Sequence, residues 1–102
     1  MTISGLHVAF IYDRMGLGGG EAVSRETGKV FASMGIYSHY YCTGLNVDEW
    51  SLPDPAMSSV EYFPNKECLW SEENVDYLLS EAKEHQIQVL IIPIAHVCPY
   101  WD

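Results

Sequence analysis

The chain has 102 residues, which is enough for one small hydrophobic core but fewer than a doubly wound enzyme domain usually contains. Its 48% of hydrophobic residues indicates a folded chain rather than a disordered one. With 5 basic and 14 acidic side chains the formal net charge is -9, which excludes the basic surface that nucleic-acid binding requires.

The cysteines and the length of the apolar segments bear on metals, cofactors and compartment. Cys42, Cys68 and Cys98 are widely spaced, include no C-x-x-C pair and have no histidine near them at metal-ligand spacing. We therefore expect reduced thiols, no bound metal and no cofactor. The sequence has neither a basic leader nor the run of ~18 apolar residues that spans a bilayer. These features predict a cytoplasmic protein without a transmembrane segment.

The first part of the chain predicts a strand, a helix and a second strand. Residues 6–12 are apolar almost without alternation, as in a strand that is covered on both faces of a parallel sheet. Glycines then form a turn, and residues 21–34 follow the period of an amphipathic helix that ends before Gly35. Residues 37–43, rich in aromatic side chains, predict the second strand. The helical positions expected to face the sheet are Val23, Thr27, Val30, Phe31 and Met34.

An irregular loop and a short strand are expected next. Residues 44–58 show no clear period, and Pro53 and Pro55 make a continuous helix or a central strand implausible there. Residues 59–63 predict a third strand, which Pro64 closes.

A helix and a fourth strand complete the predicted elements. Ser71 is a suitable N-cap for a helix over residues 72–85, because its side chain can accept a hydrogen bond from an unpaired amide of the first turn. Residues 88–95 predict the fourth strand, in which Pro93 marks a bulge or an unpaired edge. The inward stripe of the helix is expected to be Val75, Leu78, Leu79 and Ala82.

The order of these elements predicts an α/β fold. We expect a three-layer Rossmann-like domain with a four-stranded parallel sheet of spatial order 3-2-1-4 and helices on both faces. Residues 1–102 would form part of one such domain, truncated before its second half. The fourth strand would then expose a long apolar edge, and self-association through that edge is a hypothesis.

The glycine-rich turn is the first segment that could bind a ligand. Gly18, Gly19 and Gly20 precede the first helix, where backbone amides and the helix dipole favour a phosphate. A connecting turn without a ligand is the alternative interpretation. Asp13 and Arg14 directly follow the first strand and are expected at the same crevice, although a turn residue and a solvated charge explain them equally well.

The second candidate segment follows the fourth strand. Side chains beyond the carboxyl ends of parallel strands line the ligand crevice, so His96 is a candidate substrate contact and Tyr100 or Trp101 could stack on a ring of the ligand. A structural hydrogen bond is the alternative role for His96, and a nucleophile pair of His96 with Cys98 has no third orienting group. The remaining histidines, His7, His39 and His85, have no recognisable partners in the sequence and receive no role.

Residues 7–35 carry a resemblance to a known family. Tyr12-Asp13-Arg14, the loop Gly18-Gly19-Gly20-Glu21 and a helix closing on Met34-Gly35 resemble the start of the family-four retaining glycosyltransferases, which have two Rossmann-like domains of the GT-B type. The resemblance implies transfer of a sugar from a nucleotide-sugar donor to a saccharide or other acceptor. It also implies that Gly18 and Gly19 approach the donor diphosphate, that this domain mainly holds the acceptor, and that the chain alone is inactive.

Other classes of function remain open. A freestanding flavodoxin-like module that binds a ligand or partner without catalysis is the main alternative. A receiver-like module is disfavoured because no phosphorylatable Asp follows the third strand, where Pro64-Asn65-Lys66 stand. A dinucleotide-binding fragment is disfavoured because Glu21 occupies the last position of the glycine fingerprint.

Overall fold

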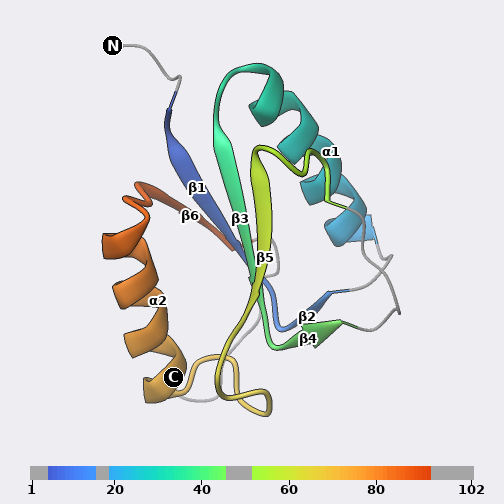
Figure 1. Ribbon diagram of the computed structural model, residues 1–102. Coiled ribbons are helices and arrows are strands. Elements are labelled where there is room, and N and C mark those ends of the chain that lie inside the picture. Colours follow the sequence, from blue (N-terminus) through green and yellow to red (C-terminus); the bar gives the residue numbers. More distant parts are fainter. Residues whose placement is uncertain (1–4, 16–18, 46–51, 93–102) are drawn as a thin grey trace.

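The protein has an α/β fold with one parallel four-stranded sheet and two helices (Figure 1). This computed structural model describes residues 5–15, 19–45 and 52–92. The sheet contains β1 (His7–Ile11), β3 (Tyr37–Cys42), β5 (Ser58–Tyr62) and β6 (Val89–Ile91), in the spatial order β5-β3-β1-β6. Counted along the chain among these four strands alone, that order is third, second, first and fourth.

Two very short strands, which the sequence did not predict, pair separately from the large sheet. β2 (Arg14–Met15) and β4 (Gly44–Leu45) form a parallel ladder in which Arg14 is opposite Gly44. They follow β1 and β3 directly, so this ladder continues the β1–β3 pairing beyond a bend at the carboxyl edge of the sheet.

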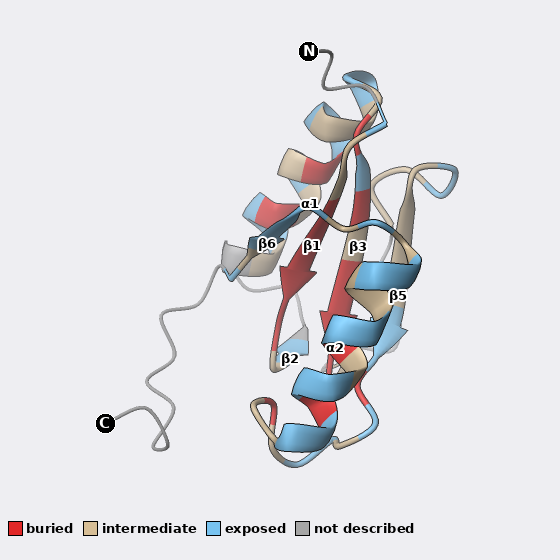
Figure 2. Ribbon diagram, turned by 90° about the vertical axis from the view of Figure 1, so that its left-hand side faces the viewer, coloured by how far each residue is buried: buried red, intermediate tan, exposed pale blue. Residues whose placement is uncertain are grey.

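The helices α1 (Gly19–Ser33) and α2 (Glu72–Glu84) lie on opposite sides of the sheet (Figure 1). Alternation along β1 provides side chains for both sides. Val8 and Phe10 belong to a buried cluster against which Phe31 of α1 packs, whereas Ala9 and Ile11 join a second cluster that includes Leu78 of α2. β1 is accordingly buried along most of its length (Figure 2), as its continuous apolar run predicted.

The predicted inward face of α1 is correct at Phe31, which packs on the core, but is displaced by one position at other residues. Val23, Val30 and Met34 are 66%, 57% and 42% exposed, while Ser24 and Gly28 are buried against the sheet. The reason is the size of the sheet side chains beneath the helix. The small residues Ser24 and Gly28 leave room for the rings of Tyr12 and Tyr40. The Tyr12 hydroxyl hydrogen-bonds with the hydroxyl of Ser24, and the Tyr40 hydroxyl donates to the Ser24 carbonyl.

The end of α1 follows the prediction. Gly35 has a φ of 78°, a left-handed conformation that favours glycine, and the amide of Ile36 donates to the carbonyl of Phe31 over 2.9 Å. The helix therefore ends where its C-terminal glycine indicated.

The predicted bounds of α2 are nearly those of the structure, but its inward stripe is again displaced. Ser71 caps the helix by accepting a hydrogen bond from the amide of Asn74 over 3.2 Å, and His85 is the C-cap. Asn74 and Leu78 are buried, whereas Val75 and Leu79 are 38% and 64% exposed. Leu78 therefore faces inward as predicted, whereas the polar residue Asn74 is buried in place of the neighbouring Val75.

β6 lies at the edge of the sheet beside β1. Val89, Leu90 and Ile92 are 41%, 50% and 46% exposed, so an apolar edge is accessible along the described part of the predicted fourth strand. Pro93 and the rest of that predicted strand lie outside the described residues. In the described part of the chain, neither helix has the length and apolar character needed to cross a bilayer.

Candidate functional site

The carboxyl edge of the sheet brings the chain segments after β1 and β3 together. The hydroxyl of Thr43 donates to the backbone carbonyl of Asp13 and to its carboxylate oxygen Oδ1, the latter over 2.9 Å. The amide of Thr43 also donates to the Asp13 carbonyl over 2.7 Å. Asp13 is therefore held at the carboxyl edge of the sheet, and one oxygen of its carboxylate is engaged by Thr43.

Arg14 lies next to Asp13 and crosses the small β2–β4 ladder. Its Nη2 donates to the carbonyl of Leu45 over 3.1 Å. A Cβ at Gly44 would come within 2.9 Å of Arg14 Nη1, so the glycine leaves space for the guanidinium to lie over β4. The Arg14 side chain is exposed and fixed across this edge.

The glycine-rich turn can be followed only in part. Gly19 and Gly20 are the first two residues of α1, so they lie at the N-terminus of a helix that begins near the carboxyl edge, as expected. Glu21 stands in the same first turn. Gly18 and His96, as well as Cys98, Tyr100 and Trp101, lie outside the described residues.

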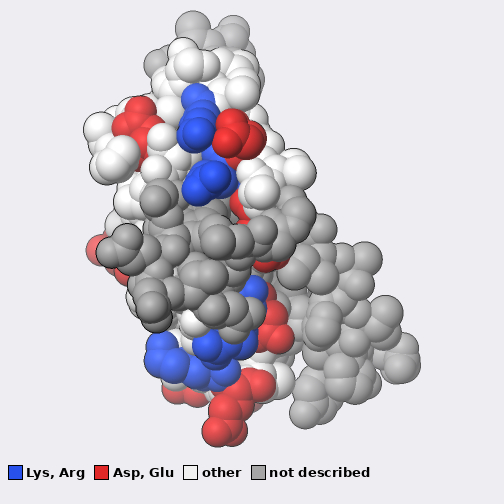
Figure 3. All heavy atoms as spheres, turned by 90° about the vertical axis from the view of Figure 1, so that its right-hand side faces the viewer, with Lys and Arg blue, Asp and Glu red and all other residues white. Residues whose placement is uncertain are grey.

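A second basic side chain that the sequence did not single out, Lys66, lies near this edge. Its Nζ is 4.9 Å from the centre of the Tyr62 ring at the end of β5. Burial raises the pKa of the Cys42 thiol to about 11, and the positive charges of Lys66 and Arg14 are among the influences that partly offset the rise. Both cations therefore lie close to the carboxyl end of β3, and Figure 3 shows basic side chains gathered in groups on the α1 side of the molecule.

A hollow of about 410 Å³ lies on the α2 side of the same edge. Asn65 and Cys68 come from the loop after β5, Trp70 and Ser71 lead into α2, and Glu72 begins the helix. Small-molecule sites commonly have volumes of ~300–1,000 Å³ and combine an apolar surface with a few polar groups. The hollow has that composition, with one large aromatic ring among amide, hydroxyl and carboxylate groups.

Asn74 holds the loop that forms this hollow. Its buried side chain donates from Nδ2 to the carbonyls of Asn65, Cys68 and Leu69 at 2.8, 2.9 and 3.0 Å. Its Oδ1 accepts from the amide of Asn65 at 2.8 Å. The loop over residues 65–69 is thus fixed by one polar side chain of α2, which explains why a polar residue occupies the inward face of the helix.

The structure therefore brings together only some of the predicted site residues. Asp13, Arg14, Gly19 and Gly20 lie along the carboxyl edge, while Lys66, Trp70 and Asn74 are additional residues of the same edge. The sequence signalled Lys66, Trp70 and Asn74 only by their positions after the third predicted strand, because side chains after parallel strands meet at one edge of the sheet.

Comparison with protein-family models, with curated proteins and with solved structures finds no match for this chain.

Proposed function

We propose that this chain is the acceptor-side, amino-terminal part of a nucleotide-sugar-dependent glycosyltransferase of the retaining GT-B type, built as a three-layer Rossmann-like domain. The proposal rests on the resemblance carried by residues 7–35. The parallel sheet with β1 in its interior and α1 beginning at Gly19 is consistent with that type of domain.

The hollow beside Trp70 is the structural observation that best supports an acceptor site. Saccharides are bound by aromatic rings that cover their apolar faces and by polar groups that hydrogen-bond to their hydroxyls. Trp70 provides the ring, and Asn65, Ser71 and Glu72 provide the polar groups. Since Asn74 holds the loop in place before any ligand binds, little conformational entropy is lost on binding. We therefore assign the acceptor sugar to this hollow.

The donor would approach the other side of the carboxyl edge. Gly19 and Gly20 begin α1, where backbone amides have no partner within the helix, and Arg14 and Lys66 add positive charge near the carboxyl end of β3. These groups suit the diphosphate of a nucleotide sugar in a chain whose overall charge is -9. Gly18, Asp13 and His96 belong to the same proposal as groups that contact substrate.

Binding of oligosaccharides tests the acceptor site. A panel of neutral and acidic glycans is titrated against the chain, and binding is followed by calorimetry and by ligand-observed NMR. We expect saturable binding of at least one glycan. Trp70→Ala should abolish it, while Trp70→Phe should retain part of it because a ring remains.

Tyr62→Ala provides a matched control, because Tyr62 is an aromatic residue of the same edge that is 44% exposed and does not line the hollow. Absence of binding to every glycan, or loss of binding in Tyr62→Ala but not in Trp70→Ala, would contradict the acceptor assignment. Tight binding of flavin mononucleotide without glycan binding would instead support the alternative, a flavodoxin-like binding module without catalysis.

A further inference from the structure

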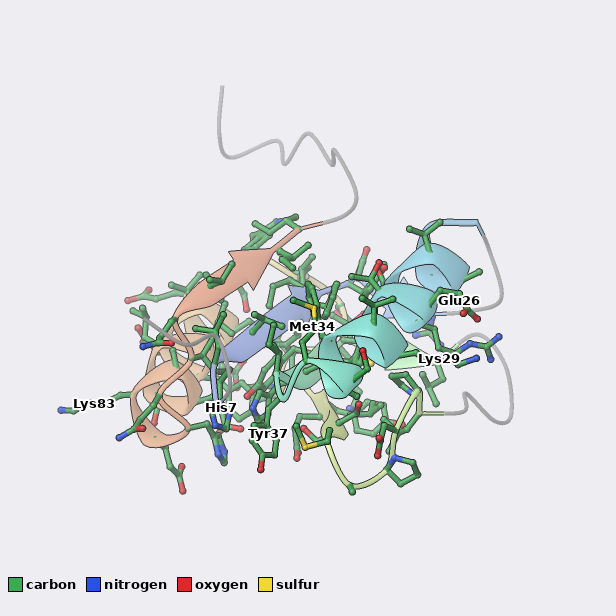
Figure 4. The ribbon with its side chains drawn as sticks, turned by 90° about the horizontal axis from the view of Figure 1, so that it is seen from above. His7, Glu26, Lys29, Met34, Tyr37 and Lys83 are labelled. Carbon is green, nitrogen blue, oxygen red and sulfur yellow. The ribbon has the colours of Figure 1, made fainter. Side chains whose placement is uncertain are left out.

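Three of the four histidines converge at the amino edge of the sheet, opposite to the carboxyl edge described above. His7 begins β1, His39 lies in β3 and His85 caps the end of α2. His7 and His39 occupy positions whose side chains project toward α2. Figure 4 looks onto this edge and shows His7 beside Tyr37, whose ring stacks on it at 4.6 Å. The expectation that these histidines have no partners is wrong.

The imidazole nitrogens of His7 and His39 face each other directly. His7 Nδ1 and His39 Nε2 are 2.9 Å apart, and the second nitrogen of His39, Nδ1, lies 3.1 Å from the hydroxyl of Ser59 on β5. The ring centre of His39 is 5.2 Å from that of His7 and 5.4 Å from that of His85. His39 therefore has one nitrogen held by Ser59 and the other directed at His7.

The end of α2 adds oxygen and nitrogen atoms beside these rings. Glu81, Glu84 and His85 each place a potential ligand atom within 4.8 Å of the others, and His85 Nε2 is 3.7 Å from Glu81 Oε1. The hydroxyls of Tyr41 and Tyr77 donate to Glu81 Oε1 over 3.4 and 3.3 Å, which orients its carboxylate.

The three rings also influence one another electrostatically. Burial, together with the neighbouring His7 and His85, lowers the pKa of His39 to about 4. Burial and the nearby His85 also lower the pKa of His7.

We propose that His7, His39 and His85, with Glu81, form a binding site for a divalent transition-metal ion of the zinc type. Imidazole and carboxylate groups are the usual ligands of such ions. Two nitrogens bound at ~2.0–2.1 Å to a tetrahedral zinc ion lie ~3.3 Å apart, so the His7–His39 pair needs to open by only a few tenths of an ångström. Among the described residues, Glu81, Glu84 and His85 are the group whose ligand atoms all lie within 4.8 Å of one another, so binding of one ion by all the proposed ligands requires the rings of His7 and His39 to rotate toward the end of α2.

The contacts around the ligands are those of a metal site. A ligating histidine almost always donates its other ring N–H to an oxygen, and Ser59 accepts that role for His39. Tyr41 and Tyr77 orient the carboxylate of Glu81 by donating their hydroxyls to its Oε1. The ion would connect β1, β3 and the end of α2, so its role is to stabilise the fold. The site is independent of the proposed function, because it lies at the opposite edge of the sheet.

Metal titration of the full chain tests the site. Zn²⁺ is titrated calorimetrically into metal-free protein, and Co²⁺ is added separately to record the visible absorption bands of a four-coordinate ion. We expect one Zn²⁺ per chain and a higher melting temperature in its presence. His7→Gln and His85→Gln should each weaken binding by at least ~10-fold, and Ser59→Ala by about 10-fold, since loss of an outer hydrogen bond typically costs that much.

An exposed carboxylate on the other helix supplies the control. Glu26→Gln removes a possible ligand from α1, on the opposite side of the sheet, and should leave both the affinity and the cobalt spectrum unchanged. Far-UV circular dichroism of each metal-free variant shows whether it is folded, so that a loss of binding is counted only for folded variants. The proposal is overturned if the wild-type chain binds no Zn²⁺, or if binding persists in both His7→Gln and His85→Gln. Loss of binding in Glu26→Gln alone would likewise overturn it.

Discussion

Gly28 lies in the middle of α1, where an alanine would ordinarily stabilise a helix by ~1 kcal/mol. The packing predicts the opposite sign. A Cβ at this position would overlap the Tyr40 hydroxyl and come within 2.7 Å of Pro53 Cγ. Tyr40 cannot move aside easily, because its ring is fully buried and stacked on Phe10 at 4.8 Å.

The expected magnitude follows from three contributions. Overpacking of a filled core costs ~1–3 kcal/mol. Displacing the Tyr40 hydroxyl also loses its hydrogen bond to the carbonyl of Ser24, which is 2.9 Å long and contributes ~0.5–1.5 kcal/mol. After the gain in helix propensity, we expect Gly28→Ala to lower the free energy of unfolding by about 1–3 kcal/mol. For a chain of this size that corresponds to a fall in melting temperature of roughly 4 °C or more.

Urea unfolding followed by circular dichroism measures this change, with Ser33→Ala at an exposed position of the same helix as the control. Tyr40→Phe removes the overlapped hydroxyl, so Gly28→Ala should be less destabilising in that background by about 1 kcal/mol or more. A more stable Gly28→Ala protein, or the same cost with and without the Tyr40 hydroxyl, would refute the close packing of α1 on β3.

Three further predictions concern the loop, the thiols and the sheet edge. Asn74→Ala removes four hydrogen bonds to the loop, so urea unfolding should show that the free energy of unfolding falls by about 2–4 kcal/mol. The control Glu73→Ala changes an exposed residue of the same helix and should alter the free energy of unfolding by less than ~0.5 kcal/mol. Equal effects of the two substitutions would contradict the role of Asn74. Burial raises the pKa of Cys42 to about 11, so its reactive thiolate is scarce at pH 8. Labelling with iodoacetamide, followed by mass spectrometry, should therefore modify the partly exposed Cys68 before Cys42. Faster labelling of Cys42 than of Cys68 would show that the Cys42 thiol is accessible. The wild-type chain should self-associate in light scattering at high concentration, and Leu90→Lys on β6 should make it monomeric; a monomeric wild type would rule out association through this edge.

Local sequence patterns were sufficient to predict the two helices and the four strands of the large sheet. The apolar run over residues 6–12 contains β1, and the Ser71 N-cap and the glycine at position 35 mark helix ends that the structure shows. These signals are local, because a strand buried on both faces and a helix terminus each require particular residues within a few positions. The short strands β2 and β4 escaped prediction because two residues contain no period.

The inward faces of the two helices were predicted only in part, correctly at Phe31 and Leu78. Hydrophobic periodicity assigned Val23 and Val30 to the interior, yet Ser24 and Gly28 occupy it. Which side of a helix faces the sheet depends on the size of the side chains beneath it, and the tyrosines of the strands require small partners there. The exposure of apolar residues on α1 therefore follows from how the helix packs on the sheet, which the pattern of apolar residues within the helix does not predict.

The sequence by itself determined the type and order of the elements, since hydrophobic period, caps and glycines act over a few residues. Only the tertiary structure decided which distant side chains meet. His7 and His39 are brought together by the parallel register of β1 and β3, in which Ala9 is opposite His39, and His85 joins them because α2 ends at the same edge. Register depends on strand pairing across the whole fold, so residues far apart in sequence form a cluster that their spacing does not reveal.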